Sequence, residues 1–230
     1  MSRVLLLVEG QTERAIAEAV LAPYLAERGV WLYSRIVGKP GHKGGNSFST
    51  VLRELKSLLL QEPSSTVTMF FDYYGLPDDW PWLSHSKGKR CDVSIAVGES
   101  AECLELSIGA AIADSIGASF NPARFIPYVQ LYEVESLLFA GPAEMAAVFQ
   151  RPELESRFSE IVETCGGCEH IDDGPETAPS KRIMRLFPRY RKGSGVNAHA
   201  YRIAQRIGVD RIRRACPHFN EWMEKLERLA

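Results

Sequence analysis

The sequence predicts an α/β fold, with a mainly parallel four-stranded sheet flanked by helices and a helical C-terminal extension. An apolar run at Val4–Val8 is followed by a glycine and then by apolar residues at helical spacing, as at the start of a βαβ unit. Strand-like and helix-like segments then alternate up to about residue 140, and from Pro142 onward only helical patterns occur. We therefore expect an α/β domain at 1–140 and a helical extension at 141–230, packed on the same domain.

The first strand and helix have the clearest pattern. Val4–Val8 contains only valine and leucine, which is typical of a strand buried on both faces of a parallel sheet. Gly10 ends the strand, and Thr12 can cap the helix that continues through Arg28. The apolar residues at helical spacing are Ala15, Ile16, Ala19, Val20 and Leu25.

The same periodicities give the remaining elements. Further strands are expected at 30–37, 66–71 and 125–131, with helices at 48–61, 99–117 and from 133 to 139. In the extension, helices are expected at roughly 142–150, 153–164, 179–187, 198–207, 209–215 and 219–229. A basic, glycine-rich loop at 38–46 could reach phosphate groups, and the segment 75–97 is irregular.

Composition narrows the class of protein. With 45% apolar and 24% charged residues, the chain has ordinary globular usage, which excludes disordered and collagen-like classes. No apolar stretch reaches the ~18 to 20 residues of a membrane span. The N-terminal apolar run resembles a signal peptide only superficially, because Glu9 ends it, and we expect a cytoplasmic protein.

The cysteines do not predict a disulfide framework or a complete zinc site. The chain has five, an odd number, which fits reduced thiols. Cys165-Gly-Gly-Cys168, with His170 nearby, resembles half a zinc site, but no second pair lies at ligand spacing. A Gly-Gly turn flanked by two thiols is the preferred interpretation.

Charge is distributed unevenly along the chain. Residues 181–230 hold 13 Lys and Arg against 4 Asp and Glu, a net of +9, whereas the first 180 residues hold 14 against 25, a net of −11. A basic third beside an acidic body indicates a surface that contacts a polyanion. Solvated helix faces would explain the same pattern, and the sequence does not separate the two.

Acidic residues follow three of the predicted strands. Glu9 ends the first, Asp72 ends the third, and Glu133 with Glu135 follows the fourth. The carboxyl ends of parallel strands meet at one edge of the sheet, where ligands bind. Carboxylates gathered there repel one another unless a cation joins them, and oxygen ligands without His or Cys favour Mg²⁺ or Mn²⁺. Such an ion can activate water and stabilise the leaving oxygen of a phosphodiester.

The motifs around these acids resemble a known family. Val8–Glu13 (VEGQTE) resembles the Toprim signature of topoisomerases, primases and nucleases of the overcoming-lysogenisation-defect type, and Phe70–Pro77 (FFDYYGLP) is similar to its second motif. Pro127–Phe139 (PYVQLYEVESLLF) resembles a more specific signature of a prokaryotic Toprim-like family of uncharacterised function, often encoded beside ATPases. Ala178–Arg182 (APSKR), with Tyr190 and Lys192, matches the same pattern.

The resemblance implies a role for each matching residue. Glu9 would be the general acid/base or a metal-bound carboxylate, and Asp72 a metal ligand. Glu133 or Glu135 would complete the metal shell. Lys181, or alternatively Lys192, would be the cation that stabilises charge on the phosphate in the transition state. Each has a simpler structural reading as well: a turn or helix cap for the acids, and a solvated helix residue for Lys181.

One position departs from the Toprim pattern. The second motif usually carries Asp-x-Asp, and here Tyr74 stands in place of the second Asp. A phenol is a poor Mg²⁺ ligand, so a two-metal site would need Glu133 and Glu135, or Asp78 and Asp79, to compensate. The aromatic residues near Asp72 could stack on bases, although packing is the preferred interpretation.

Two functional hypotheses follow. The leading one is a Mg²⁺- or Mn²⁺-dependent endonuclease acting on DNA or RNA, under the control of a partner ATPase, as the effector of a prokaryotic defence or repair system. The alternative is a catalytically degenerate Toprim module that binds nucleic acid or a partner protein. Oligomeric state is left open by the sequence. A topoisomerase is disfavoured because the chain has no room for a separate cleavage domain and gate.

Overall fold

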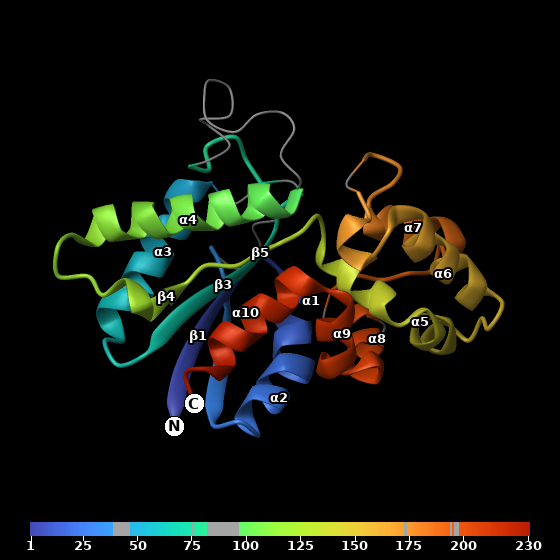
Figure 1. Ribbon diagram of the computed structural model, residues 1–230, viewed down its shortest axis with the longest axis horizontal. Helices are drawn as coiled ribbons and strands as arrows, with labels where there is room; N and C mark the ends of the chain where they lie inside the picture. The colour runs from blue at the N-terminus through green and yellow to red at the C-terminus, as the bar shows by residue number, and fades with distance from the viewer. Residues whose placement is uncertain (39–46, 75, 82–96, 173, 194, 196–197) are drawn as a thin grey trace.

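A parallel sheet forms the centre of the computed structural model, which describes residues 1–230 except 39–46, 75, 82–96, 173, 194 and 196–197 (Figure 1). Its five strands are β1 (Ser2–Val8), β2 (Val30–Ile36), β3 (Thr66–Asp72), β4 (Phe125–Ile126) and β5 (Val129–Gln130). They lie in the order β2-β1-β3-β4, β5 also pairs with β3, and every pair is parallel. The predicted α/β class is confirmed.

The connection from β1 to β2 is one helical segment with a wider turn inside it. It runs through α1 (Gln11–Ile16), the π-helical turn η1 (Ala17–Leu21) and α2 (Ala22–Ala26). Pro23 lacks an N–H and its ring would collide with the carbonyl four residues earlier, which explains why the helix widens just before it. The prediction that Thr12 caps this helix is wrong: the helix begins at Gln11, and the Thr12 hydroxyl accepts a hydrogen bond from the Gly193 backbone N–H at 2.8 Å.

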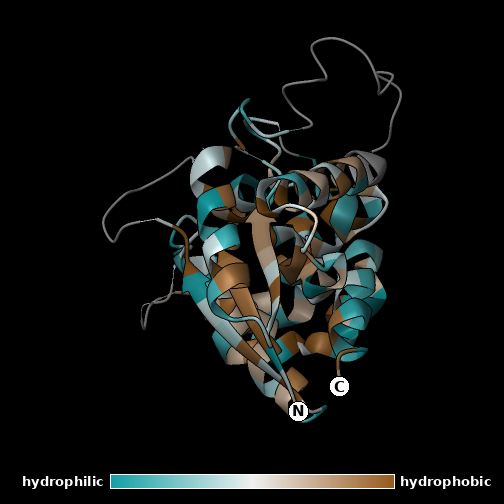
Figure 2. Ribbon diagram, turned by 90° about the vertical axis from the view of Figure 1, so that its left-hand side faces the viewer, coloured by the Kyte–Doolittle hydropathy of each residue, from teal (hydrophilic) through white to brown (hydrophobic). Residues whose placement is uncertain are grey.

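Helices cover both faces of the sheet. On one face α3 (Phe48–Gln61) and α4 (Val97–Ile116) bury a cluster that includes Leu5, Val67 and Phe71. The opposite face packs against α1, α2 and α10 (Pro217–Glu227) (Figure 1). Strands and inward helix faces are apolar while outward faces are polar (Figure 2), so burial of both sheet faces holds the layers together.

The fourth predicted strand is broken into two short ones. β4 and β5 are separated at Pro127, which has no N–H to donate to the ladder. Between them the Tyr128 ring turns onto Trp222, with ring centroids 4.3 Å apart. The segment after β5 forms a 3₁₀ helix, η3 (Val134–Ala140), after a short connection that contains Tyr132.

The helices after residue 141 share an apolar core with the sheet. They are α5 (Pro142–Phe149), α6 (Leu154–Cys165), α7 (Pro179–Leu186), α8 (Ala200–Ile207), α9 (Val209–Ala215) and α10. A short 3₁₀ turn, η4 (Cys168–His170), lies between α6 and α7, and another, η2 (Pro122–Arg124), precedes β4. Val4 of β1, Ile203 of α8 and Trp222 of α10 belong to one buried cluster. The last helix returns the chain to its start, so that the two termini lie side by side, with the Ser2 hydroxyl donating to the Leu229 carbonyl (Figure 1). A domain boundary at 140/141 stays a prediction.

Two further features of the sequence have a place in the fold. Gly166 ends α6 in the left-handed conformation at φ +77°, and the Gly167 N–H donates to the Val162 carbonyl at 3.0 Å, as in a Schellman cap. The basic loop 38–46 lies outside the described residues except for Gly38, whose N–H donates to Glu54 at 2.8 Å. Within the described parts of the chain, no helix is long and apolar enough to cross a membrane.

Candidate active site

The ends of β1 and β3 bring Glu9 and Asp72 to the same edge of the sheet. Val8 is in register with Phe70, and the Glu9 N–H donates to the Phe70 carbonyl at 3.4 Å. Burial raises the pKa of the half-buried Glu9 carboxyl, and a hydrogen bond from the Asp72 backbone and the charge of Lys192 offset only part of this rise. The strand register therefore accounts for the first pair of predicted residues.

Asp72 also holds the start of η3. Its Oδ1 accepts a hydrogen bond from the Val134 N–H at 2.8 Å. Burial, followed by the negative charges of Glu13, Glu135 and Glu9, raises the pKa of Asp72 well above its usual value. Because the charges of Glu13, Glu135 and Glu9 all act on Asp72, these carboxyls form an acidic cluster around it.

Glu133 is fixed on both of its oxygens by the start of α7. Oε2 accepts from the Ser180 N–H at 2.7 Å, and Oε1 accepts from the Ser180 hydroxyl at 2.9 Å. The residue before it, Tyr132, has a φ of +61°, a left-handed conformation that costs about 1 kcal/mol or more for a side chain with a Cβ. This turn directs the chain from β5 into η3 and places Glu133 toward α7.

Glu135 is fully buried and only half satisfied. Its Oε1 accepts from the Tyr190 hydroxyl at 3.2 Å and lies 3.1 Å from the Lys192 ammonium. Its Oε2 is buried and has no hydrogen-bond partner among the described residues. Burial raises the pKa of Glu135, although Lys192 opposes the shift. An unpartnered buried carboxylate oxygen indicates room for a cation or a further donor.

Glu13 joins this cluster, although it was not among the site residues predicted from the sequence. It is buried in the first turn of α1, and its pKa rises to about 7 because of burial and then the charges of Glu135 and Glu9. Gly10 leaves space for it, since a Cβ there would lie 3.1 Å from the Glu13 Oε2. The signal in the sequence is its position four residues after Glu9, in the first turn of the helix that follows β1.

The two candidate lysines differ in position. Lys192 lies 3.4 Å from Glu133 and 3.1 Å from Glu135, and its side chain is 45% exposed. Burial works against its charge, but Glu135, Glu133 and Asp72 outweigh this and raise the pKa of Lys192. Lys181 is exposed on α7, one residue after Ser180, and makes no ion pair within the described residues. The structure thus brings Lys192, rather than Lys181, to the carboxylates.

The residues that follow Asp72 in and just after the second motif have structural contacts outside the acidic cluster. Tyr74 is 40% exposed, and its N–H donates to the Tyr132 carbonyl at 2.9 Å, which extends the pairing beyond β3. Asp79 accepts from the Phe48 N–H at 2.9 Å and so caps α3. Trp80 is fully buried against Phe48 and Phe71, which is the packing role preferred for it.

The donor chemistry of the cluster fits a hard divalent cation. Its acidic members offer only carboxylate oxygens, the charges of Glu9 and Glu135 raise the pKa of Glu13 and Asp72, and one buried carboxylate oxygen lacks a partner among the described residues. In the conformation described, however, no three Asp, Glu, His or Cys side chains among the described residues are arranged to hold an ion. Lys192 provides the positive charge between Glu133 and Glu135, so a bound metal would require these side chains to reorient.

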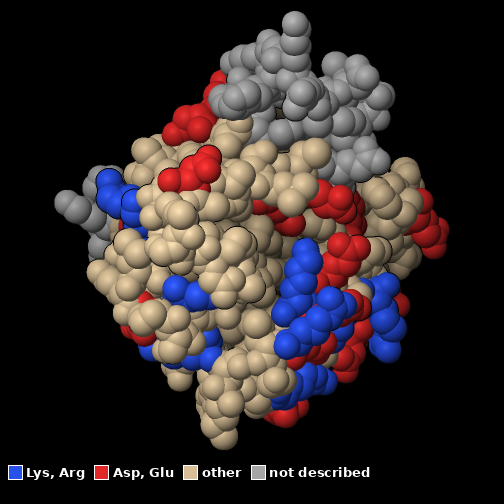
Figure 3. Space-filling view, turned by 60° about the vertical axis from the view of Figure 1, so that its left-hand side comes forward, with Lys and Arg blue, Asp and Glu red and all other residues tan. Residues whose placement is uncertain are grey.

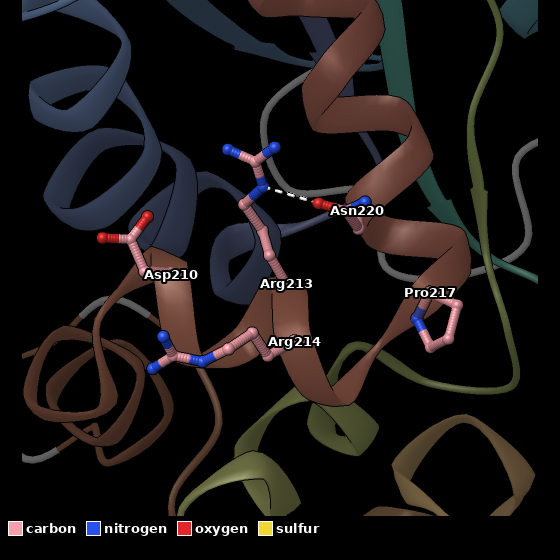
Figure 4. A pocket seen from close by; sticks show the side chains of 5 residues that line it. All are labelled: Asp210, Arg213, Arg214, Pro217 and Asn220. Atoms are coloured by element: carbon pink, nitrogen blue, oxygen red, sulfur yellow. Dashed lines mark hydrogen bonds between the residues drawn. The ribbon is translucent and has the colours of Figure 1, made fainter.

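A separate surface pocket of about 560 Å³ lies between α9 and α10 (Figure 4). Asp210, Arg213, Arg214, Pro217 and Asn220 line it. Arg213 is already engaged: its Nε donates to Asn220, and its Nη1 donates to Tyr24 and Glu227, each at 2.7 Å. None of the acidic cluster lines this pocket, and it shows no catalytic arrangement.

Comparison with known proteins gives a family and one structural likeness. Residues 8–227 match the model of a domain of unknown function, DUF4276. No curated protein matches the chain. A solved structure of the C-terminal region of the OLD protein from Xanthomonas campestris pv. campestris is similar, with a TM-score of 0.46 and 15% identity over 99% of this chain and 93% of that one. Because the family match spans nearly the whole chain and contains every member of the acidic cluster, the protein belongs to the DUF4276 family.

Proposed function

We propose that this protein is a metal-dependent phosphodiesterase that cleaves nucleic acid. The observation that carries the proposal is the gathering of Glu9, Glu13, Asp72 and Glu135 at the carboxyl edge of a parallel sheet, where burial raises the pKa of all four and the charges of Glu9 and Glu135 raise those of Glu13 and Asp72 further. Such a cluster is costly to a fold unless it binds a cation or a proton. A function that uses the carboxylates explains why the cost is tolerated.

The residues divide into two groups by their contacts. Glu9, Glu13, Asp72 and Glu135 would hold Mg²⁺ or Mn²⁺, which when bound activates water and offsets charge on the phosphate. Glu133, held twice by Ser180, would keep Lys192 in place. Lys192 would then stabilise negative charge on the phosphate, since its side chain is 45% exposed and its ammonium is anchored by Glu135. Glu9, half-buried and with a raised pKa, is suited to accept or donate a proton.

The test is cleavage by the purified chain with Mg²⁺ or Mn²⁺ on duplex DNA, single-stranded DNA and RNA. Glu9→Gln and Asp72→Asn should lower the cleavage rate by roughly 10²-fold or more. Glu160→Gln, an exposed acid on α6 paired with Arg157, is the matched control and should cleave as wild type does. Equal traces of cleavage in wild type and both site variants would contradict the proposal.

A non-catalytic module is the second candidate, and one observation favours it. Lys192 already pairs with Glu133 and Glu135, and the carboxylates of the described residues are not arranged around an ion. Tyr74 adds to this, because it supplies no carboxylate at the second motif. Calorimetric titration with Mg²⁺ and Mn²⁺ separates the two: saturable binding that is lost in Asp72→Asn supports the enzyme, and no binding supports the module.

Regulation by a partner ATPase, in a defence or repair system, is part of the same proposal. Its support is the similarity of the Pro127–Phe139 motif to a family often encoded beside ATPases. Co-purification of the chain with the product of a neighbouring ATPase gene, and a change in cleavage rate on adding that ATPase with ATP, would test it.

A further inference from the structure

The arginines of the basic C-terminal third fall into two groups by their contacts. Several pair with carboxylates: Arg182 with Asp172, Arg185 with Glu176, Arg211 with Glu144, Arg213 with Glu227 and Arg228 with Glu224. On the face seen in Figure 3, basic side chains lie interspersed with acidic ones in the same way. Five others have no carboxylate partner among the described residues and are exposed: Arg189, Arg191, Arg202, Arg206 and Arg214. Of these, Arg191, Arg202 and Arg206 lie on α8 or are tied to its start.

Arg191 lies on the segment that supplies Lys192 to the acidic cluster, whereas Arg202 and Arg206 lie on the neighbouring helix α8. Arg191 stands between Tyr190, which donates to Glu135, and Lys192, which pairs with it. The Arg191 N–H donates to His199 Nδ1 at 3.0 Å, and the His199 N–H donates back to the Arg191 carbonyl at 3.1 Å. Residue 191 is therefore tied to the start of α8.

Arg202 and Arg206 follow on α8 itself. They are four residues apart, so their side chains lie one turn apart on the same side of the helix. Helix α8 packs against α1 and η3, the elements that carry Glu13 and Glu135. Arg191 is thus next to Lys192 in the chain, and Arg202 and Arg206 lie on the exposed side of a helix that packs against the elements carrying the cluster.

The pKa of His199 is sensitive to the charges of these arginines. Its ring stacks on Tyr190, with centroids 5.8 Å apart. Burial lowers the pKa of His199, and the charges of Arg202 and Arg191 lower it further, against a hydrogen bond from the Arg191 backbone. Both guanidinium groups therefore act on the same point, where no carboxylate of the described residues compensates them.

We infer that Arg191, Arg202 and Arg206 form a phosphate-contacting surface that holds the sugar–phosphate backbone of the nucleic acid beside the carboxylate cluster. The inference rests on the proposed function for its substrate class. Uncompensated arginines bind phosphodiesters through charge-assisted, bidentate hydrogen bonds. An extended polyanion suits several such charges, two on α8 and one on the segment tied to its start, better than a compact anion does.

The experiment measures binding without cleavage, in EDTA, by fluorescence anisotropy of labelled duplex DNA and of labelled single-stranded RNA at several salt concentrations. Arg191→Ala/Arg202→Ala is compared with Arg185→Ala/Arg228→Ala, which removes two exposed, ion-paired arginines and changes the net charge equally. We expect the first double variant to bind about tenfold more weakly, with a log–log salt slope shallower by about 2. The control should keep the wild-type slope, and the substrate that shows the contrast identifies DNA or RNA as the natural partner.

A second readout follows His199 by NMR. Binding of the oligonucleotide should raise the pKa of His199 in wild type, because phosphate charge offsets Arg202 and Arg191, and should leave it unchanged in the Arg191→Ala/Arg202→Ala variant. Equal affinity and equal salt slope in the two double variants, or no binding of nucleic acid by wild type, would contradict the inference that these arginines contact phosphate. If wild type cleaves nucleic acid while the two double variants bind it equally well, the phosphate-contacting surface is contradicted and the proposed function is supported. If the two double variants differ in affinity as expected but wild type cleaves nothing with metal, the phosphate-contacting surface is supported and the proposed enzymatic function is contradicted.

Discussion

At the scale of single residues, Glu13 shows how burial and neighbouring charge combine. Its pKa rises from 4.5 to about 7. Between these pH values the folded protein therefore keeps a proton on Glu13 that the unfolded chain has released. The neutral form stabilises the fold fully below pH 4.5, and this contribution is lost as pH rises through 7. Above that, the charged carboxyl weakens the fold unless a cation joins the cluster.

Glu13→Gln should remove this pH dependence. Between pH 4.5 and 8 the variant should lose less unfolding free energy than wild type, by up to about 3 kcal/mol, an upper bound because the neighbouring carboxyls titrate together. Urea denaturation at the two pH values measures it, with exposed Glu160→Gln as the control. Parallel pH profiles for wild type and Glu13→Gln would show that Glu13 does not titrate in this range.

The two lysines give a matched pair. Lys192→Met leaves Glu135 buried without a cation, so the pKa of Glu135 should rise and the variant should be destabilised more at pH 8 than at pH 5. Because Lys192 is 45% exposed, we expect only about 1–2 kcal/mol at pH 8. Lys181→Met, at an exposed position, should change stability by less than about 0.5 kcal/mol at either pH. Equal effects of the two substitutions in urea denaturation would contradict the assignment.

At the scale of elements, the sequence predicted features that depend on local patterns and missed features that depend on tertiary packing. Helix 48–61 was expected where the structure has α3, because its apolar spacing is regular. Strand 125–131 was expected whole, although Pro127 could have indicated the break between β4 and β5. The strand ends placed Glu9 and Asp72. The contact of Lys192 with the carboxylates depends on how the 190–193 segment packs against the start of α1, which no local pattern encodes. Glu13, by contrast, could have been found from its spacing after Glu9.

The turn from β1 into α1 offers a test at this scale. The Gly10 backbone is extended, with φ −148°, so Gly10→Ala should not strain the chain. Its new Cβ would crowd the Glu13 carboxylate at 3.1 Å, and we expect about tenfold weaker Mg²⁺ binding in calorimetry with little loss of stability. Gly109→Ala, in open space within α4, is the control and should stabilise the fold by up to about 1 kcal/mol. Unchanged metal affinity in Gly10→Ala would remove Glu13 from the ligand set.

At the scale of the whole molecule, α10 joins the two predicted parts of the chain. Trp222 is 1% exposed, stacks on Tyr128 at 4.3 Å, and donates its indole N–H to the Thr68 hydroxyl at 2.9 Å. The helical extension therefore supplies a central side chain to the core on one face of the sheet. A large aromatic side chain buried in this way contributes about 3–5 kcal/mol relative to alanine.

This packing predicts one cooperative unfolding transition rather than two. Trp222→Ala should lower the free energy of unfolding by about 3–5 kcal/mol, and far-UV circular dichroism and calorimetry should still report a single midpoint, because sheet and extension lose the same core. Trp31→Phe, on the exposed edge strand β2 with 45% of the side chain accessible, should cost less than about 1 kcal/mol. Two separate transitions in wild type would mean that residues 141–230 fold independently, and that the contact through Trp222 is an interface between domains rather than a shared core.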